Sequence, residues 1–451
     1  MESLIKSQRD YFNSNITKPI AFRLEQLSKL WDVLQANEDA LQLAITKDYG
    51  KGVFETFLTE FYIIYDEIKT SIAGLEDWAA KKIVDTNMLN APAKSYIVPE
   101  PLGVSLIIGP WNYPYQLSLA PVVAAMAAGC TVVLKPSELT KNCSAIMARL
   151  ISENFDPRYF AVVEGGIPET TALLDKKFDV IFFTGSVPVG KVVYQAAVKN
   201  LTPVILELGG KSPVIVMPDA DLEIVVKRLI WAKFANAGQT CIAPDYVLVH
   251  SDIEEEFLKT AASEIALANY SIENGNYVNI VNERNAGRVA ALIDPEKVFI
   301  GGKYDLAARF IEPTIIRGVS WEDKVMQEEI FGPLLPVLSF DDLDGAIARI
   351  KERPKPLSLY LFTGDEQIKE KIISEISFGG GCINEALMHI ANGELPFGGV
   401  GDSGIGNYHG EYGFKAFSHY KSILDKELSA DPDVKYSPHT AEKLAILKSI
   451  V

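Results

Sequence analysis

The stretch VSLIIGPWNYPYQLSLAPVVAAMAAGCTVVLK, residues 104–135, decides the fold class of this chain. Its first apolar run, Val104–Ile108, and its last, Thr131–Leu134, are typical of buried strands. The segment between them, Leu117–Ala128, has the length and composition of a helix. A strand, a helix and a second strand in this order predict a βαβ unit, in which the two strands run parallel.

The same alternation continues beyond this stretch. Further strands are predicted at Phe160–Val163, Val180–Phe183 and Pro203–Leu206, and helices at Lys141–Asn154, Thr170–Lys176 and Val187–Val198. Repeated βαβ units predict an α/β fold with a parallel, doubly wound sheet. Because ligands of such sheets bind at the carboxyl ends of the strands, we sought the functional residues there.

The remaining segments have other patterns. A second α/β region is predicted from near Lys211, with strands at Val214–Val216, Val247–His250, Leu335–Leu338, Leu359–Phe362 and Gly381–Asn384. Residues 3–82 predict several helices. Residues 87–101 contain prolines and short alternation, which predict an extended excursion or hairpin toward another domain or subunit. Residues 398–419 are rich in glycine and aromatics and are expected to form an ordered loop.

The composition is that of a globular protein of enzyme size and not of a disordered chain. The 451 residues include 48% hydrophobic and 23% charged side chains, enough for a large core and for two or three domains. The net charge of −16 argues against a nucleic acid or an anionic membrane as a partner, because binding phosphates requires clustered Lys and Arg.

The cysteines and the termini indicate a reduced, cytoplasmic protein. The four cysteines include no C-x-x-C pair, so neither a metal site nor a disulfide framework is predicted. The N-terminus lacks the basic and apolar regions of a signal peptide. No apolar run approaches the roughly 18 residues of a membrane span, and residues 426–451 carry too many charges for a transmembrane anchor.

Cys241 lies in an unusual place. The apolar face of a predicted helix ends at Phe234, and Asn236-Ala-Gly-Gln-Thr-Cys241 follows. A free cysteine is most often an inert buried hydrophobe, and Cys130, Cys143 and Cys382 fit that interpretation. The small and polar residues before Cys241 are not the neighbours of a packed core, so a nucleophile remains the alternative.

Two further residues are candidates for chemistry. Glu207, in VILELGG, ends an apolar strand, where desolvation would raise its pKa toward the range of a general base; the alternative is a carboxylate that caps a turn. Asn112, in GPWNYP, lies in a turn that could hold an amide donor rigidly, but asparagine also favours turns for backbone reasons.

Two segments are candidates for cofactor binding. Lys135 and Glu138 follow a strand and could bind the hydroxyls of a ribose, or could simply form a solvated turn. The segment Thr184-Gly-Ser-Val-Pro-Val-Gly190 leads from a strand into a helix, where phosphate oxygens are favoured, but it lacks the G-x-G-x-x-G fingerprint and could be a plain turn.

Seven motifs taken together resemble the aldehyde dehydrogenase superfamily. They are IIGPWNYP, VLKPSE, FFTGSVPVGK, LELGGKSP, ANAGQTCIAPDYVLV, QEEIFGPLLPV and LPFGGVGDSGIGNYHGEYGFKAFSH, in this order. GPWNYP, GQTCIAPDY and the terminal GNYHG…FSH look like the class 3 and fatty-aldehyde dehydrogenase branch. The resemblance runs from about Leu24 to Tyr420.

The resemblance implies a role for each candidate. Cys241 matches the nucleophile, which forms a thiohemiacetal and then a thioester with an aldehyde. The Asn112 amide and the Cys241 backbone N–H match the oxyanion donors, and Glu207 matches the base that activates the hydrolytic water. The implied substrate is a medium-chain, long-chain or aromatic aldehyde. Tyr113, Trp231 and Met388 are then expected as walls of its funnel.

The resemblance also implies a nicotinamide cofactor. The residues that match its binding positions are Trp111, Lys135, Glu138, Gly185, Ser186, Gly190, Glu329 and Phe331. Glu138 favours NAD, since it can bind a free 2′-hydroxyl and would repel a 2′-phosphate, whereas Lys135 would offset that repulsion. We therefore expect NAD first and NADP second.

The implied architecture has three parts and pairs into a homodimer. Residues 1–85 and 102–208 would form a Rossmann-like NAD(P)-binding domain, residues 209–412 an α/β catalytic domain, and residues 86–101 and 413–451 a small bridging or oligomerisation element. Two rival functions remain. One is a relative that transfers the acyl group to coenzyme A or phosphate, although such enzymes commonly lack Glu207. The other is an inactive structural descendant, although this chain keeps both Cys241 and Glu207.

Overall fold

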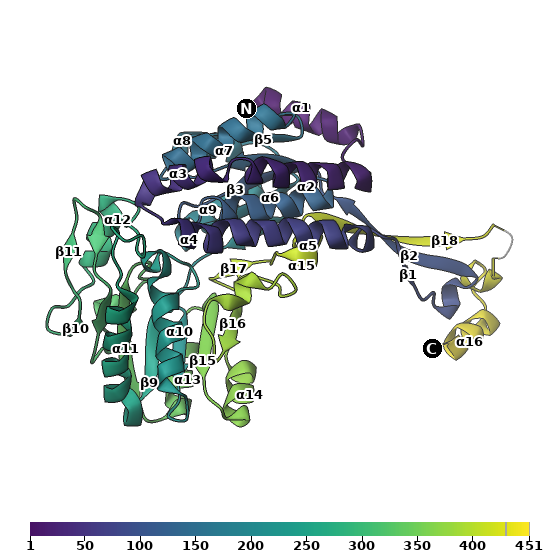
Figure 1. Cartoon of the computed structure of the whole chain (residues 1–451). Coiled ribbons are helices and arrows are strands. Elements are labelled where there is room, and N and C mark those ends of the chain that lie inside the picture. Colours follow the sequence, from purple (N-terminus) through teal and green to yellow (C-terminus); the bar gives the residue numbers. More distant parts are fainter. Residues whose placement is uncertain (429–430, 451) are drawn as a thin grey trace.

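The computed structural model describes residues 1–428 and 431–450 of the chain. Within those residues, the strands form a six-stranded, a seven-stranded and a three-stranded sheet, together with a two-stranded hairpin. Each of the two larger sheets is covered by helices, and the small sheet projects away from them as an arm (Figure 1). The predicted α/β fold class is confirmed.

The first sheet is built from the predicted βαβ units. Its strands follow the order β17 (Gly404–Ile405), β7 (Val204–Glu207), β6 (Val180–Thr184), β3 (Val104–Ile108), β4 (Thr131–Lys135) and β5 (Phe160–Val162). Strands β3 to β7 run parallel, and β17 joins β7 in the antiparallel direction. The predicted strand positions agree with these bounds to within one residue at each end.

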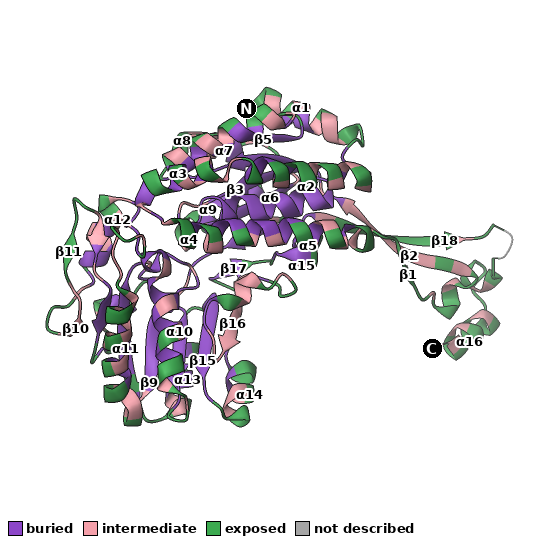
Figure 2. Cartoon of the chain, in the orientation of Figure 1, coloured by how far each residue is buried: buried purple, intermediate pink, exposed green. Residues whose placement is uncertain are grey.

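Helices cover both faces of the first sheet because successive side chains of each strand point to opposite faces. Phe182 and Ile205 belong to the core shared with α2, α5 and α6, whereas Phe183 and Leu206 pack with α1, α8 and α9. The helices of this part are α1 (Glu2–Asn13), α2 (Ile20–Gln35), α3 (Glu38–Tyr49), α4 (Val53–Thr56), α5 (Tyr62–Trp78), α6 (Gln116–Ala128), α7 (Lys141–Asn154), α8 (Ile167–Leu174) and α9 (Val187–Val198). Every residue of α6 is buried, which explains its apolar composition all round (Figure 2).

The second sheet belongs to the other α/β part. Its strands follow the order β10 (Val298–Ile300), β13 (Thr314–Ile316), β14 (Leu334–Phe340), β9 (Tyr246–His250), β8 (Pro213–Val216), β15 (Ser358–Phe362) and β16 (Gly380–Ile383). Its helices are α10 (Leu222–Phe234), α11 (Glu254–Ala268), α12 (Glu283–Ala290), α13 (Leu343–Lys351) and α14 (Glu366–Glu375), and β11 (Tyr304–Asp305) pairs with β12 (Phe310–Ile311) as the hairpin. The five predicted strands are present, whereas β10 and β13 were not predicted.

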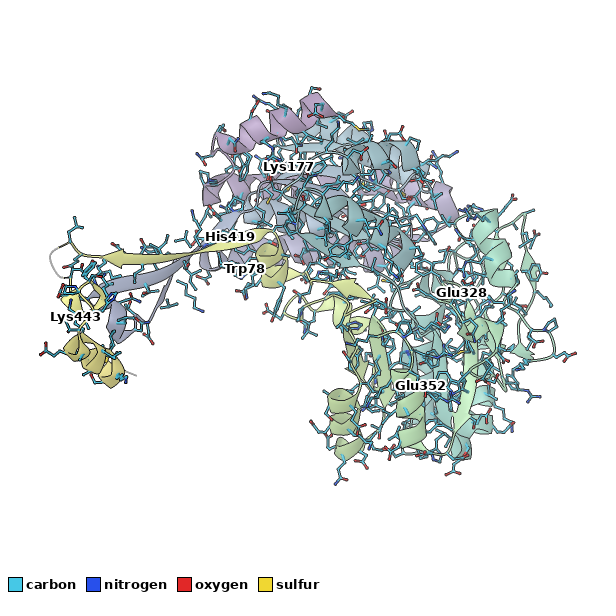
Figure 3. The ribbon with its side chains drawn as sticks, turned by 180° about the vertical axis from the view of Figure 1, so that it is seen from behind. Trp78, Lys177, Glu328, Glu352, His419 and Lys443 are labelled. Atoms are coloured by element: carbon cyan, nitrogen blue, oxygen red, sulfur yellow. The ribbon has the colours of Figure 1, made fainter. Side chains whose placement is uncertain are left out.

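The arm joins segments from opposite ends of the sequence. It consists of β1 (Lys82–Val84), β2 (Ala93–Pro101) and β18 (Ser418–Lys426), with α16 (Ala441–Ile450) beyond it. In β2 and β18, Pro101 is opposite Ser418 and Ala93 is opposite Lys426. Figure 3 shows Trp78 and His419 at the root of the arm and Lys443 at its far end. The predicted excursion at residues 87–101 is therefore an antiparallel strand with a short 3-10 turn, Met88–Asn90, before it.

One sequence-based expectation is wrong. Residues 398–419 do not form only a loop, because they include β17 and a short helix, α15 (Gly410–Ala416). The glycines that suggested a loop allow close packing instead: a Cβ atom at Gly413 would lie 2.9 Å from the Cβ of Ala124 on α6. Glycine therefore marks a close approach between two helices here rather than a helix-breaking position.

A buried ion pair fixes the start of α6. Lys51 and Glu60 have no exposed side-chain surface, and Lys51 Nζ lies 3.1 Å from Glu60 Oε1. The other carboxylate oxygen of Glu60 accepts hydrogen bonds from the backbone N–H groups of Tyr115 (3.1 Å) and Gln116 (2.9 Å). These groups have no partner within the helix, so Glu60 both satisfies them and complements the helix dipole.

We expect Lys51→Met to lower the free energy of unfolding by about 3–5 kcal/mol, because it leaves the Glu60 carboxylate buried without its cation. Thermal and urea unfolding of the purified variant measure this loss. The matched control is Lys6→Met, which removes the ion pair between Lys6 and Asp10. The side chain of Lys6 is 74% exposed and that of Asp10 is 63% exposed. That change should barely alter the melting temperature. Equal small effects in both variants would contradict the structural role assigned to Lys51.

Candidate active site

A left-handed turn brings Cys241 to the site. After α10 the chain enters a short 3-10 segment in which Asn236 has φ 52°, Ala237 has φ 52° and Gly238 has φ 71°. Only glycine adopts such angles freely, so Asn236 and Ala237 each cost about 1–3 kcal/mol. At Gly238 a Cβ atom would lie 2.3 Å from the carbonyl oxygen of Gly332, which requires glycine there.

Hydrogen bonds from several elements hold this turn. The Asn236 backbone N–H donates to Glu55 Oε1 at 2.7 Å, and the Asn236 side-chain amide donates to the carbonyl oxygen of Asn112 at 2.9 Å. Gln239 Nε2 donates back to the Asn236 carbonyl oxygen at 3.0 Å, and Gln239 Oε1 accepts from the Val281 N–H at 2.9 Å. The strained backbone is therefore fixed from both α/β parts.

Asn112 belongs to the same network. Its side chain is 3% exposed, and its Nδ2 donates to the Gln239 carbonyl oxygen at 3.0 Å. The Tyr49 hydroxyl donates a hydrogen bond to the Asn112 carbonyl oxygen at 2.9 Å. The amide group has two N–H donors, so one remains for a ligand when the other binds Gln239.

Glu207 ends β7 in an apolar environment. It is 3% exposed, and neither of its carboxylate oxygens has a hydrogen-bond partner among the described residues. Burial raises the pKa of this carboxyl well above its ordinary value. A carboxylate with a raised pKa binds a proton more strongly, which suits a general base.

Cys241 lies where two hollows of the structure meet. It is partly exposed and lines both a narrow apolar hollow, here called the tunnel, and a larger cleft. Burial, with a contribution from Glu329 and Glu207, raises the pKa of its thiol. Cys130 and Cys143 are buried, as an inert role predicts, and Cys382 is partly exposed on β16.

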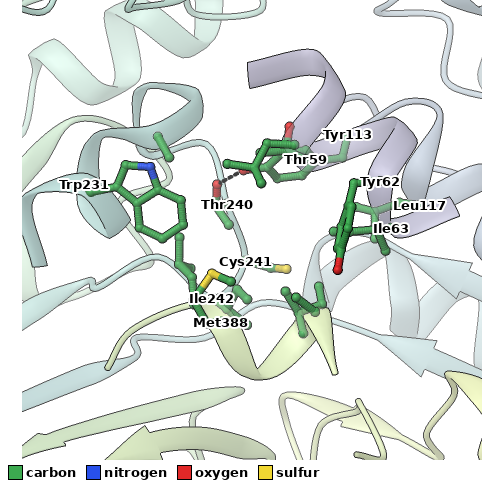
Figure 4. Close-up of a pocket in the computed structure, with 15 residues that line it drawn as sticks. Thr59, Tyr62, Ile63, Tyr113, Leu117, Trp231, Thr240, Cys241, Ile242 and Met388 are labelled. Atoms are coloured by element: carbon green, nitrogen blue, oxygen red, sulfur yellow. Dashed lines mark hydrogen bonds between the residues drawn. The ribbon is translucent and has the colours of Figure 1, made fainter. Parts of the chain in front are cut away.

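The tunnel contains the predicted funnel residues. Tyr113, Trp231 and Met388 all line it, and Figure 4 shows them around Cys241. The Tyr113 hydroxyl lies 2.6 Å from Thr240 Oγ1, so its polar end is satisfied and its ring faces the tunnel. The other lining residues are Leu58, Thr59, Tyr62, Ile63, Leu117, Ala235, Thr240, Ile242, Leu387, Ile390 and Ala391. An apolar ligand is the kind that this surface accepts.

The cleft contains both other catalytic candidates and most of the predicted cofactor residues. Asn112, Glu207, Trp111, Gly185, Ser186, Glu329 and Phe331 line it. The rings of Trp111 and Phe331 meet edge to face, with centroids 5.3 Å apart. Ser186 precedes the first turn of α9 and its side chain makes no capping hydrogen bond; Ser186, Val187 and Pro188 all line the cleft, so the N-terminus of α9 faces it.

The lining of the cleft fits a dinucleotide. A Cβ atom at Gly209 would lie 2.0 Å from Glu329 Oε2, and one at Gly185 would lie 2.6 Å from the ring of Phe183. A side chain at either position would push the Glu329 carboxylate or the Phe183 ring aside, so glycine lets these two side chains pack directly against the backbone. Glu329 Oε1 is buried without a partner among the described residues, and burial next to Asp245 raises the Glu329 pKa to about 8.

Three predicted cofactor residues lie outside the lining of this cleft. Lys135 is buried at the end of β4, where its Nζ lies 2.7 Å from the Pro136 carbonyl oxygen and 3.7 Å from Glu138 Oε2. Glu138 is largely exposed, with 47% of its side chain accessible. Gly190 lies within α9 and packs against Leu208, where a Cβ atom would approach to 2.5 Å.

Sequence reasoning missed several residues of the site. Gln239 and Asn236 were visible in the motif around Cys241, and their small polar character was the available signal. Glu55, Thr59 and Tyr62 come from the N-terminal helices, where nothing in the local pattern separates them from ordinary surface residues. Only the tertiary structure brings them to Cys241.

None of the helices in residues 1–428 and 431–450 is long and apolar enough to cross a membrane. In the same residues, no group of three or more His, Cys, Asp and Glu side chains is arranged to hold a metal ion.

Comparisons with known proteins agree with this geometry. The model of the "Aldehyde dehydrogenase family" matches residues 1–423. A 4,4'-diaponeurosporen-aldehyde dehydrogenase of Staphylococcus aureus is 46% identical over 444 residues, which cover 97% of this chain and 96% of the relative. A mouse "aldehyde dehydrogenase, dimeric NADP-preferring" is 42% identical over 446 residues, 98% of each chain. The solved structure of a substrate-bound Staphylococcus aureus AldH has a TM-score of 0.97 and 45% identity, covering 99% of this chain and 98% of the other.

The raised pKa of Cys241 predicts how the thiol reacts without ligands. Only the thiolate is alkylated, so the rate of Cys241 modification by iodoacetamide should rise about tenfold per pH unit between pH 7 and 9, without reaching a plateau. Mass spectrometry of the Cys241 peptide measures the rate, and Cys241→Ala is the control for reaction at other thiols. A plateau below pH 8 would contradict the raised pKa.

Proposed function

The chain belongs to the aldehyde dehydrogenase family and is an enzyme that oxidises an aldehyde to the carboxylic acid with NAD(P)⁺, and we propose that Cys241, Glu207 and Asn112 carry out the chemistry. One observation carries the proposal: Cys241 lines both hollows, and Glu207 and Asn112 line the cleft with it. A substrate in the tunnel and a cofactor in the cleft would meet at the thiol.

Cys241 is the proposed nucleophile. Its sulfur, once deprotonated, attacks the carbonyl carbon, a C–S bond forms, and the carbonyl electron pair moves to the oxygen. The free N–H of the Asn112 amide and the backbone N–H of Cys241 donate to this oxyanion. The left-handed turn supports this assignment, because it presents the Cys241 backbone and side chain together at the junction of the two hollows.

Glu207 is the proposed base of the second half-reaction. It takes a proton from a water molecule whose oxygen attacks the thioester carbon; the C–S bond then breaks, the acid leaves, and the thiolate of Cys241 is regenerated. The apolar surroundings and the raised pKa of Glu207 support this role. They also favour hydrolysis over acyl transfer to coenzyme A or phosphate, and the presence of both Cys241 and Glu207 argues against an inactive structural descendant.

The cleft is the proposed cofactor site. When bound, NAD(P)⁺ supplies the oxidising power of the reaction by accepting a hydride. Trp111, Phe331 and Glu329 would hold its nicotinamide end, and Gly185 and Ser186 its phosphates. We propose Lys135 and Glu138 for the adenosine ribose and Gly190 for the phosphate-side turn. NAD is preferred because of Glu138 and NADP is accepted as well; the mouse relative is described as NADP-preferring.

The tunnel is the proposed aldehyde site. Its walls are apolar, and the polar atoms of Tyr113 and Thr240 bind each other. We therefore propose a medium-chain, long-chain or aromatic aldehyde, whose apolar body would be desolvated by Trp231 and Met388. The Staphylococcus aureus relative is named a 4,4'-diaponeurosporen-aldehyde dehydrogenase.

We expect Glu207→Gln to keep the first turnover and lose the later ones, because it removes the base of deacylation only. Stopped-flow absorbance with NAD and a medium-chain aldehyde should show a burst of about one reduced cofactor per subunit. A steady-state rate at least about 100-fold below the wild type should follow. Absence of a burst would mean that Glu207 acts before the thioester forms.

Cys241→Ala separates the nucleophile from the base in the same assay. This variant should show neither burst nor turnover, while fluorescence titration should show unchanged NAD binding. A variant that lacks Cys241 and still turns over would overturn the proposed mechanism as a whole.

We further propose that the chain is a cytoplasmic homodimer formed through the arm. The free thiols of the described residues suit a reducing compartment, and recovery of the native protein in a membrane fraction would contradict that location. The arm exposes apolar side chains that a monomer would leave in water: Ile83 is 77% exposed, Met88 73% and Leu424 49%. The mouse relative is described as dimeric.

Light scattering on the intact protein should therefore give twice the chain mass of 49.6 kDa. Replacing Ile83 and Met88 by Asp should shift the mass to that of the monomer, because charges would have to be buried in the interface. Leu267→Asp is the matched control: Leu267 is 77% exposed on α11, at the opposite end of the molecule (Figure 1). A wild-type monomer at micromolar concentration would contradict the proposal.

A further inference from the structure

The face of the first sheet behind Glu207 carries an unusual set of polar groups. In the register of β6 and β7, Phe182 is opposite Ile205 and Thr184 is opposite Glu207. Side chains two residues apart share a face, so Thr184 and Glu207 lie on the face that Phe182 and Ile205 bury under α6. The ring of Tyr408 packs edge to face on Phe182, with centroids 5.0 Å apart.

Three of these residues, together with Gln116 at the start of α6, are buried with polar atoms that lack a well-formed hydrogen bond. Thr184 is 7% exposed, Glu207 3%, Gln116 2% and Tyr408 0%. Among the described residues, these atoms are Thr184 Oγ1, both Glu207 carboxylate oxygens, Gln116 Nε2 and the Tyr408 hydroxyl, and the Gln116 side chain and the Tyr408 hydroxyl lie close enough to interact with each other. A buried group without a partner costs about 1–3 kcal/mol, so a concentration of such groups in one place points to bound water that satisfies them.

Contacts with Phe397 and His409 fix the position of Tyr408. Its backbone pairs in both directions with that of Phe397, at 3.0 and 2.8 Å. His409 stacks on its ring at a centroid distance of 4.2 Å, and His409 Nδ1 lies 3.0 Å from Glu67 Oε2. Burial keeps the Tyr408 pKa well above its ordinary value, so the hydroxyl stays neutral and can both donate and accept.

We propose that Thr184, Gln116, Glu207 and Tyr408 form a water-binding site behind the nucleophile, and that the Tyr408 hydroxyl acts through this water to position the Glu207 carboxylate for deacylation. The inference rests on the proposed role of Glu207 as the base. Tyr408 and Gln116 supply donors that a charged carboxylate needs once it is out of bulk water. Tyr408 is a positioning residue in this arrangement and does not itself touch the substrate.

The direction in which the pH profile of kcat should shift follows from the charges around Glu207 and Tyr408. The titratable groups that share this surrounding are Cys241, Glu329, Glu67 and His409. Loss of a donor disfavours the charged carboxylate and raises the Glu207 pKa further. On the acid limb of the pH profile, kcat falls because Glu207 is protonated and cannot act as a base. This limb must then move to higher pH.

Tyr408→Phe tests the proposal, since it removes one hydroxyl and keeps the ring. We expect a full first-turnover burst, a kcat lowered about tenfold, and an acid limb of kcat at higher pH, with KM for the aldehyde little changed. Gln116→Met removes the second donor at similar volume and should act in the same direction. This second variant keeps the test open if Tyr408→Phe folds poorly.

Tyr159→Phe is the matched control. Tyr159 is 1% exposed, its hydroxyl also has no partner among the described residues, and it packs against Phe22, next to β5. This variant should leave kcat and its pH profile unchanged. If Tyr408→Phe behaves in the same way while Glu207→Gln still accumulates the acyl-enzyme, the water site is wrong and the proposed function stands. If the acyl-enzyme of Glu207→Gln is hydrolysed at the normal rate, the proposed role of Glu207 as the base is wrong, and the water site has no function to support.

Discussion

The left-handed turn at Asn236–Gly238 is the constraint on which the surroundings of Cys241 depend. Two residues other than glycine adopt unfavourable backbone angles there, and the structure holds them with hydrogen bonds from Glu55, Asn112 and Gln239. Asn112 both supports the turn through its carbonyl oxygen and binds the Gln239 carbonyl with its side chain. The proposed nucleophile and the proposed oxyanion donor are therefore parts of one network and cannot move independently.

Low polarity is the second property that the site shares throughout. Cys241, Glu207 and Glu329 all have a raised pKa because burial disfavours their charged forms. An anion on any one of them would also raise the proton affinity of the others, since unscreened charges interact strongly in such surroundings. The site thus favours one negative charge at a time, which suits a reaction in which charge appears first on the sulfur and later on the base.

The fold was largely predictable because buried parallel strands are continuous apolar runs. Val104–Ile108 and Lys141–Asn154 were predicted with the bounds that the structure has. Short strands such as β10 and β13 were missed, since three residues give no period to read. Gly413 misled the prediction because a glycine that permits close helix packing looks the same in sequence as one that ends a helix.

The site was predictable only in part, for a related reason. Glu207 ends a strand, and Cys241 and Asn112 lie in turns after regular elements; the motifs there are compact, so the resemblance to a family can be read. Glu55, Thr59 and Tyr62 reach the site from helices whose local pattern is ordinary, so only their tertiary neighbours distinguish them. Tyr408 and Gln116 gave no signal either, because an unsatisfied hydroxyl or amide is a property of packing and not of a sequence pattern.

The pairing of β17 with β7 has a consequence for the synthesis of the protein. Gly404 stands opposite Glu207, and the Leu208 N–H donates to the Ser403 carbonyl oxygen at 3.1 Å. Chains emerge from the ribosome with their N-terminal parts first, so β7 remains an open sheet edge until residues near the C-terminus arrive. Open edges are templates for aggregation. A nascent chain of this protein therefore carries its proposed catalytic base on an unprotected edge while the residues between Glu207 and Gly404 are synthesised, and a product terminated before Gly404 never covers it.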